Sequence, residues 1–243
     1  MGVQRMSYIP NPKTSGSGII CGIPQPGRCP NNCTSCFFQS GRSYLEPLAE
    51  NLPNMPTLAQ AEGRVLRVND GNDSHHCQSQ VVKDTLAYPD KFYNTACPSD
   101  LEKYPGPVVL TLNPGTDTDE KYAIVSDDEA RNLMAVRFRI NTWNADMARE
   151  AAEYYAADLD VAVFMTWMAY HNKYEIPETH LPNYTYRRRT MNAYWAIHDN
   201  ICRNVMEDFE DLPRVYLCGE LGRTKCRDCG NCLREYYRWK ESQ

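Results

Sequence analysis

Seven of the eleven cysteines lie in two short groups, and their spacing is typical of metal-binding sites. The N-terminal group has the spacing C-x3-C-x2-C and consists of Cys29, Cys33 and Cys36. Three thiolates on one short loop can hold a cuboidal iron–sulfur cluster, but they leave one of its four irons without a protein ligand. Such an open iron can bind a substrate or a cofactor. A zinc site would instead need a fourth ligand, usually from a second C-x2-C knuckle.

The C-terminal group supplies four thiolates within fifteen residues, from Cys218, Cys226, Cys229 and Cys232. Four ligands close the coordination shell of a metal, so this group is expected to be structural or to relay electrons. Cys226-Arg-Asp-Cys229-Gly is similar to a zinc knuckle, whereas three cysteines at successive intervals of three are typical of bacterial ferredoxins. The spacing therefore leaves two alternatives open, a second [4Fe-4S] cluster or a zinc ion.

The chain around these cysteines alternates between short β-branched or aromatic runs and helical stretches. Six strands are predicted, at 18–23, 65–70, 91–95, 108–113, 133–143 and 161–170, with a further apolar run at 215–217. The clearest helix is predicted at 145–157, and weaker ones at 58–63, 74–86 and 119–132. The segments 39–56 and 174–184 are predicted as long loops. Strands that alternate with helices favour a parallel α/β sheet or barrel.

The predicted strand at 133–143 carries two arginines on one face. Its apolar residues 136, 138 and 140 face one way, while Arg137, Arg139 and Asn141 face the other. In an α/β barrel one strand face packs on helices and the other points into the lumen, where two arginines need anionic partners from the protein or from a ligand. An edge strand with a solvated polar face is the alternative.

Most of the predicted strands end in polar residues. These are Asn69 and Asp70, Asn94 and Thr95, Asn113, and Asn141 and Thr142. In parallel α/β folds ligands bind at the carboxyl ends of the strands, so these side chains are expected to share one site. Turn formation alone would account for some of them, because Asn and Asp also favour turns and helix caps.

With its cysteine triplet placed directly after the first predicted strand, the chain resembles the radical S-adenosylmethionine (radical SAM) superfamily. The signature of that superfamily, C-x3-C-x-aromatic-C, lies on the loop after the first strand of a partial (β/α)6 barrel. Ser35 departs from the signature, because it stands where the family usually has an aromatic residue. Phe37 and Phe38 follow the third cysteine instead.

A second segment adds to the resemblance. The chain reads Asp70-Gly71-Asn72-Asp73 at the end of the second predicted strand, where the family carries a Gly-Gly-Glu-type segment that binds the amino group of SAM. Asp70 or Asp73 could accept a charge-assisted hydrogen bond from that ammonium. A plain turn is the alternative, because Asp-Gly and Asn-Asp are common turn sequences.

The resemblance implies a definite chemistry. The open iron of a [4Fe-4S] cluster would chelate SAM, and one electron from the reduced cluster would release a 5′-deoxyadenosyl radical that takes hydrogen from a substrate. Arg139, Asn141 and Asn113 are expected to bind the methionine carboxylate or the ribose, and Phe37 and Phe38 to lie at the cofactor site. The implied partners are a small-molecule or nucleotide-like substrate, which the lumen arginines favour as anionic, and an electron donor such as flavodoxin or ferredoxin.

The expected fold is α/β, a partial (β/α)6 TIM-like barrel with a small C-terminal cysteine-rich, metal-binding subdomain. The expected boundaries are an N-terminal extension at 1–14, the barrel at 15–200 and the subdomain at 201–243. Auxiliary iron–sulfur clusters are common C-terminal additions in the resembled family. The cysteine-rich ends alone also show a looser likeness to uncharacterised phage proteins, which implies no activity.

Composition excludes several broad classes of protein. With 42% hydrophobic and 23% charged residues among 243, the chain has the composition of a globular domain and not of a disordered one. No run approaches the ~18 apolar residues of a membrane span, and residues 1–18 lack the apolar core of a signal peptide. A cytoplasmic protein without membrane contact is therefore expected. The local motifs of P-loop NTPases, α/β-hydrolases and zinc metalloproteases are absent.

The net charge of −5 disfavours broad nucleic-acid binding, although the segment 184–190 interleaves aromatic residues with Arg187, Arg188 and Arg189. Such a segment can hold a single-stranded nucleic acid by charge and stacking. The favoured interpretation is a helix start whose arginines pair with the acidic run 207–211. A non-enzymatic iron–sulfur or zinc protein, with nucleic-acid contacts through these arginines, is the alternative to an enzyme.

Overall fold

In the computed structural model the described residues form a seven-stranded parallel sheet and a separate two-stranded hairpin. The structure describes residues 7–33, 35–41, 43–112, 125–188, 193–219, 221 and 225–243. The sheet has the order β1-β2-β3-β4-β5-β6-β9, so neighbours follow chain order except at the last position. Its strands are β1 (Ile19–Gly22), β2 (Val65–Val68), β3 (Lys91–Thr95), β4 (Val108–Leu112), β5 (Leu133–Ile140), β6 (Ala162–Trp167) and β9 (Val215–Leu217). The predicted α/β fold, a partial TIM-like barrel, is confirmed.

Helices connect the strands, and a hairpin lies between β6 and β9. The helices are α1 (Leu48–Asn51), α2 (Leu58–Ala61), α3 (Gln78–Thr85), α4 (Asp127–Ala130), α5 (Ala145–Glu153), α6 (Asp199–Glu207), α7 (Cys226–Cys229) and α8 (Asn231–Glu241). A π-helical turn at Tyr154–Asp158 continues α5, and short 3-10 helices lie at Leu101–Lys103, Lys173–Glu175 and Glu178–Asn183. The hairpin pairs β7 (Tyr184–Arg188) with β8 (Ala193–Ile197) in antiparallel fashion.

One face of the sheet packs against helices. Because side chains alternate along each strand, every second residue points to this face. The buried cluster includes Leu66, Val68, Leu110, Val136, Phe138 and Val163 of the strands with Val81 of α3 and Ala148, Ala151 and Ala152 of α5. This apolar cluster is the main core, and it holds the strands so that their carboxyl ends lie along one edge.

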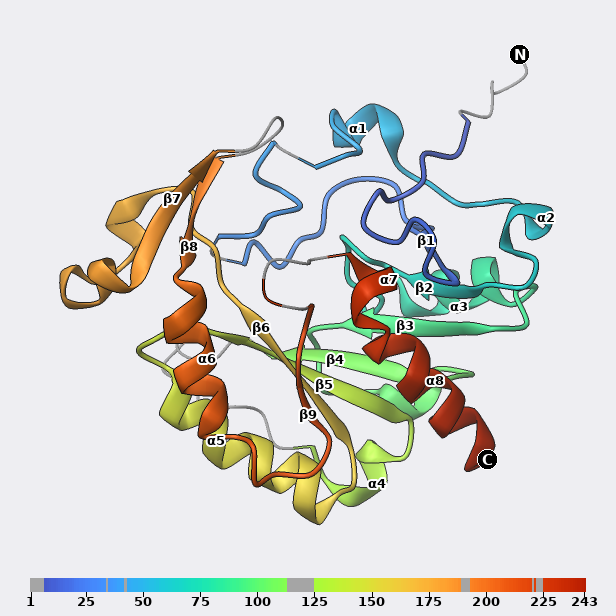
Figure 1. Ribbon diagram of the computed structural model, residues 1–243. Helices are drawn as coiled ribbons and strands as arrows, with labels where there is room; N and C mark the ends of the chain where they lie inside the picture. The colour runs from blue at the N-terminus through green and yellow to red at the C-terminus, as the bar shows by residue number, and fades with distance from the viewer. Residues whose placement is uncertain are drawn as a thin grey trace.

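The opposite face of the sheet lines the lumen of the half-barrel, and α8 lies across it (Figure 1). Strand residues Val65, Phe92, Val109, Ala135, Ala162 and Phe164 form an apolar cluster there with Leu233 and Tyr236 of α8. Nearer the carboxyl ends of the strands the same face becomes polar, with Arg67, Asn94, Thr111, Arg137, Arg139 and Thr166. The C-terminal helix therefore fills the apolar half of the lumen.

A buried ion pair fixes α8 in this position. Glu235 of α8 has a side chain that is 1% exposed, and it pairs with Arg214 at 2.7 Å. Arg214 directly precedes β9 and also pairs with Asp160 at 2.8 Å. The pair thus joins α8 to the sheet at the edge opposite the carboxyl ends of the strands.

We expect Glu235→Ala to lower the free energy of unfolding by about 3 kcal/mol, because it leaves a buried guanidinium without its main charge partner. Chemical denaturation measures this change. Glu241→Ala, an exposed change in the same helix, is the control and should stay within about 0.5 kcal/mol of the parent. An equally small effect of Glu235→Ala would contradict the anchoring role.

Several predicted boundaries differ from those in the structure. The second predicted strand ends at Val68 and not at residue 70, because Asn69 takes a left-handed backbone conformation with φ of 61°. The fifth ends at Ile140, where the side chain of Asn141 accepts the backbone N–H of Trp143 and begins a turn. The segment 39–56 contains α1 and is not entirely loop. The domain boundaries stay a prediction, although β9 and α8 belong to the same sheet and lumen as β1–β6.

The prediction of a helix start at 184–190 is wrong, because Tyr184–Arg188 form β7. The aromatic and β-branched residues of this segment are typical of strands. Arg187 pairs with Asp199 at 3.0 Å. In the acidic run 207–211, Asp211 pairs with Arg149 at 2.6 Å. Arg189 lies outside the described residues.

Among the helices in the described ranges, none combines the length and the apolar character that a bilayer-crossing segment requires.

Candidate functional site

The carboxyl edge of the sheet gathers most of the residues that the sequence singled out. Since all seven strands are parallel, the segments that follow them emerge at the same edge. The cysteine triplet follows β1, the segment 70–73 follows β2, and Cys218 follows β9. Arg139 lies near the end of β5. One edge of the half-barrel therefore carries both cysteine groups.

Asp73 joins the cysteine loop to the sheet. Its side chain is buried, at 3% exposure, and accepts hydrogen bonds from Asn31 of the cysteine loop at 2.7 Å and from Thr95 at the end of β3 at 2.7 Å. The backbone N–H groups of His75 and Ala96 also donate to this carboxylate, at 2.9 and 2.8 Å. Four donors occupy both of its oxygens, so Asp73 acts as a structural link in this conformation.

On its other side the cysteine loop contacts β5 and the hairpin. Arg139 donates to the backbone oxygen of Ser35 at 3.4 Å, and the hydroxyl of Ser35 donates to Glu175. Phe37 packs edge-on against Tyr194 of β8, with ring centroids 5.7 Å apart. In Figure 1 the blue segment after β1 accordingly runs toward β7 and β8. The loop is therefore held across the carboxyl edge at several points.

Gly71 and Phe38 are in direct contact. A Cβ atom built on Gly71 would lie 2.0 Å from Cε2 of the Phe38 ring, so no other residue fits without moving the ring. Phe38 in turn packs on Tyr44 and on the buried cluster of Ile23, Leu45, Leu48 and Leu52. Gly71 therefore allows Phe38 to pack directly against the backbone of the segment 70–73.

Asp70 is buried and only partly satisfied. Its side chain is 1% exposed, its Oδ2 accepts from Asn11 at 2.5 Å, and Arg67 lies 3.5 Å from the same oxygen. Its Oδ1 is buried and has no hydrogen-bond partner within the described residues. A buried carboxylate oxygen in this state is a ready acceptor for a ligand donor.

Arg67 was not singled out by the sequence analysis, although the pattern of β2 contains the signal. In Val65-Leu66-Arg67-Val68 the arginine points to the same face as Val65, which is the lumen face. Burial acts to lower the pKa of this guanidinium, but the thiols and the carboxylate beside it hold that pKa well above its usual value. Arg67 is therefore a fixed positive charge inside the lumen.

The three thiols of the N-terminal group lie on one loop, close enough that Cys33 and Cys36 affect the pKa of Cys29. Burial raises the pKa of Cys29 to about 11, and the charges of Asp73 and of the two neighbouring thiols add to the rise. A protonated thiol becomes a ligand only when a metal displaces its proton. Three cysteine sulfurs on one loop are the donor set that an iron–sulfur cluster uses, once their protons are displaced.

The C-terminal thiols lie beside the lumen strands and not in a separate lobe, with Cys232 packed against the apolar lumen cluster and Cys218 exposed. Burial raises the pKa of Cys232 to about 11, while the charges of Arg137 and Arg67 on the strands act to lower it. Cys218 and Cys226 contribute to the raised pKa of both Cys229 and Cys232, so the four thiols lie in one group. Across the described ranges, no three His, Cys, Asp or Glu side chains lie in an arrangement that could hold a metal ion as they stand.

The remaining residues singled out by the sequence have other surroundings. Asn141 is fully buried, and its amide contacts Tyr170 at 3.2 Å. Arg137 reaches Asn94 at 3.3 Å across the lumen face. Asn72 caps the neighbouring turn by accepting from the backbone of Asp73 at 2.9 Å. Asn113 lies outside the described residues.

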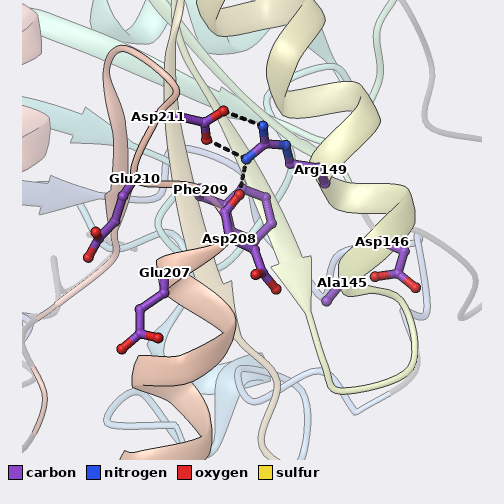
Figure 2. Close-up of a pocket in the computed structure, with 8 residues that line it drawn as sticks. All are labelled: Ala145, Asp146, Arg149, Glu207, Asp208, Phe209, Glu210 and Asp211. Atoms are coloured by element: carbon purple, nitrogen blue, oxygen red, sulfur yellow. Dashed lines mark hydrogen bonds and ion pairs between the residues drawn. The ribbon is translucent and has the colours of Figure 1, made fainter.

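A pocket on the helical face of the molecule lies away from this edge, between α5 and the end of α6 (Figure 2). It is lined by Ala145, Asp146, Arg149, Glu207, Asp208, Phe209, Glu210 and Asp211. Arg149 donates to both carboxylate oxygens of Asp211, at 2.6 and 2.7 Å, and to the backbone oxygen of Asp208. Arg149 is thus already paired, and no cysteine is among the residues that line this pocket.

The fold is similar to that of a solved structure, a mutant of spore photoproduct lyase. The two superimpose with a TM-score of 0.54 at 14% sequence identity, over 89% of this chain and 80% of that chain. At this identity the match shows the fold alone. No protein-family model matches the sequence, and no curated protein matches it. The structural match gives no support to the looser likeness with phage proteins.

Proposed function

We propose that the protein is a radical SAM enzyme, with a [4Fe-4S] cluster at Cys29, Cys33 and Cys36 and SAM bound beside it. The observation that carries the proposal is the position of a C-x3-C-x2-C loop after β1, at the carboxyl edge of a parallel half-barrel. The fold match is a second support, because spore photoproduct lyase is itself a radical SAM enzyme. Three thiol ligands leave one iron free for SAM.

When bound, the cluster would supply one electron to SAM, and the resulting 5′-deoxyadenosyl radical would take a hydrogen atom from the substrate. The protein's own task is to hold the cofactors in place and to exclude water. The contacts of Asp73 with Asn31, and of Arg139 with Ser35, hold the cysteine loop over the edge of the sheet. A loop fixed on both sides keeps the three thiols in one place.

Asp70 is the residue that we propose for the ammonium group of SAM. Its Oδ1 is buried without a partner, whereas both oxygens of Asp73 are occupied. A charge-assisted hydrogen bond from the ammonium would satisfy this oxygen. Gly71 would let Phe38 pack beside the same cofactor, while Asn72 and Asp73 shape the turn and Phe37 covers the outer side of the loop.

Arg139 is the proposed partner of the methionine carboxylate. It lies on the lumen face near the carboxyl end of β5, beside the backbone of Ser35. Guanidinium groups bind carboxylates strongly because two N–H groups can donate in parallel. Asn113, which directly follows β4 in the sequence, is proposed for the ribose. Asn141 would not contact the cofactor itself. Its buried hydrogen bonds form the turn that ends β5, on which Arg139 lies.

The substrate that we propose is a small anionic or nucleotide-like molecule, bound in the polar half of the lumen. Arg137 supports this proposal, because its Nε is buried without a hydrogen-bond partner within the described residues. The Oγ1 of Thr166, on β6, is in the same state. The one-electron step requires a reductant, such as flavodoxin or ferredoxin.

The experiment that tests the function is anaerobic. The protein is reconstituted with iron and sulfide, dithionite and SAM are added, and 5′-deoxyadenosine is measured by mass spectrometry. The parent should form it, the Cys29→Ala, Cys33→Ala, Cys36→Ala triple variant should not, and Cys77→Ala, a change at an exposed thiol outside both groups, should match the parent. A parent that binds no cluster, or binds one without cleaving SAM, contradicts the proposal and leaves a non-enzymatic metal protein.

A further inference from the structure

The N-terminal segment 8–17 is bonded to β1 and to the chain that follows it. The hydroxyl of Tyr8 donates to the carbonyl of Cys21 in β1 at 2.7 Å. The side-chain amide of Asn54 accepts from the backbone N–H of Ile9 at 2.9 Å and donates to its carbonyl at 2.8 Å. Asn54 is itself buried, and its backbone pairs with the chain directly after β1. The segment is therefore fixed against the first strand of the sheet.

Within this segment a turn orients the side chain of Asn11, which is only 8% exposed. Its Oδ1 accepts the backbone N–H of Lys13 at 2.9 Å, and its backbone carbonyl accepts the N–H and the hydroxyl of Thr14 at 3.1 and 3.0 Å. Asn favours such turns because its side chain can bond the backbone two residues further on. Since a backbone N–H can only donate, the amide atom that faces Lys13 is the oxygen. The NH₂ group of Asn11 is thus left to donate elsewhere.

Asn11 binds one oxygen of Asp70 and leaves the other open. Its Nδ2 donates to Oδ2 of Asp70 at 2.5 Å. The hydroxyl of Tyr44 donates to the same oxygen at 3.4 Å, and Arg67 lies 3.5 Å from it. Oδ1, in contrast, is buried and has no hydrogen-bond partner in the part of the chain that the structure describes. The contact with Asn11 is the shortest of the three, so it contributes most to the orientation of the carboxylate.

A closer ion pair with Arg67 is the alternative arrangement for this carboxylate. The Nε of Arg67 is buried and has no hydrogen-bond partner among the described residues, as is true of Oδ1 of Asp70. A carboxylate free to rotate would form the bidentate pair that guanidinium groups prefer, which would give both of these atoms a partner. The hydrogen bond from Asn11 to Oδ2 opposes this rotation.

We propose that Asn11 is a positioning residue for SAM: by holding Oδ2 of Asp70, it keeps Oδ1 available to the ammonium group of the cofactor. This role rests on the proposed function, in which Asp70 accepts that ammonium. The N-terminal segment 8–17, which carries no cysteine, thereby becomes part of the cofactor site. Residues that bind a ligand depend on such supporting hydrogen bonds, and the loss of one typically weakens binding by about 10- to 100-fold.

Binding of SAM to the reconstituted protein, measured by equilibrium dialysis without a reductant, tests this role separately from turnover. Asn11→Ser keeps a hydroxyl that can accept the N–H of Lys13, but it removes the amide that donates to Asp70. It should weaken SAM binding by about 10- to 100-fold at parental iron content, and so should Asn11→Ala. Ser15→Ala, an exposed change in the same segment, is the control and should bind SAM as the parent does.

The double variant Asn11→Ser, Arg67→Gln separates positioning from a merely structural role. With the competing guanidinium removed, Oδ1 of Asp70 is open again, so this variant should bind SAM about 5-fold more tightly than Asn11→Ser. Parental affinity in the folded single variants, a double variant that binds no better than Asn11→Ser, or failure of both single variants to fold would overturn the inference. A parent that does not bind SAM would refute the proposed function as well, so the two failures are distinguishable.

Discussion

Replacing Asp73 with alanine is expected to lower the free energy of unfolding by about 3–5 kcal/mol and to abolish cluster binding at the N-terminal thiols. The change leaves four donors without their acceptor, two of them the backbone N–H groups of His75 and Ala96. It also releases Asn31, and with it the anchor of the cysteine loop to the sheet. Asp73→Asn should be destabilising too, because its amide would turn a donor toward other donors.

Chemical denaturation measures the first effect, and iron content after anaerobic reconstitution at low temperature measures the second. Asp84→Ala is the matched control, since Asp84 is an exposed aspartate on α3 that accepts one hydrogen bond from Gln80. It should change stability by less than about 0.5 kcal/mol. If Asp73→Ala folds with parental stability and full iron content, Asp73 does not link the loop to the sheet.

Gly71→Ala is expected to reduce SAM cleavage about 100-fold. The new methyl group would overlap the ring of Phe38 at 2.0 Å, so the ring and the loop that carries it must shift. A displacement of about 1 Å at a catalytic site typically costs 10²-fold in rate. The fold itself should lose only about 1–3 kcal/mol, because the ring can move toward the surface.

The double variant Gly71→Ala, Phe38→Ala separates this clash from other effects. With the ring removed, alanine at 71 has room, so the double variant should be more active than Gly71→Ala and about as active as Phe38→Ala. Stabilities should likewise be non-additive by at least about 1 kcal/mol in a double-mutant cycle. Strictly additive losses would mean that the contact between these residues carries no coupling.

Much of the sheet could be predicted from the sequence, because buried parallel strands leave a strong signal. The runs at 91–95 and 215–217 match β3 and β9. The ends of β2 and β5 could not be predicted, because Asn69 and Asn141 both fit the residue pattern of a strand. In the structure Asn69 leaves the strand through its backbone conformation, and Asn141 through a hydrogen bond of its side chain. Local competition of this kind is decided by φ and by hydrogen bonds that a residue pattern does not contain.

The candidate site was predictable where one loop or one strand end carries it. The cysteine triplet and Asp70 are local signals, and the sheet topology explains why they meet at one edge. The position of the C-terminal thiols was not predictable, because it depends on which face of the sheet α8 covers. The amphipathic pattern of a helix predicts that one face is buried, but not against which surface. For α8 that surface is set by apolar lumen residues such as Phe92 and Phe164.

The covering of the lumen by α8 has a consequence for synthesis on the ribosome. In chain order α8 follows β1–β6 by more than sixty residues, so these strands emerge well before their inner apolar face can be covered. Until α8 arrives, Val65, Phe92, Val109 and Phe164 remain open to solvent or to other nascent chains. The half-finished barrel is thus a natural client for a chaperone that binds exposed apolar strands, and slow translation of the last part of the chain would prolong that need.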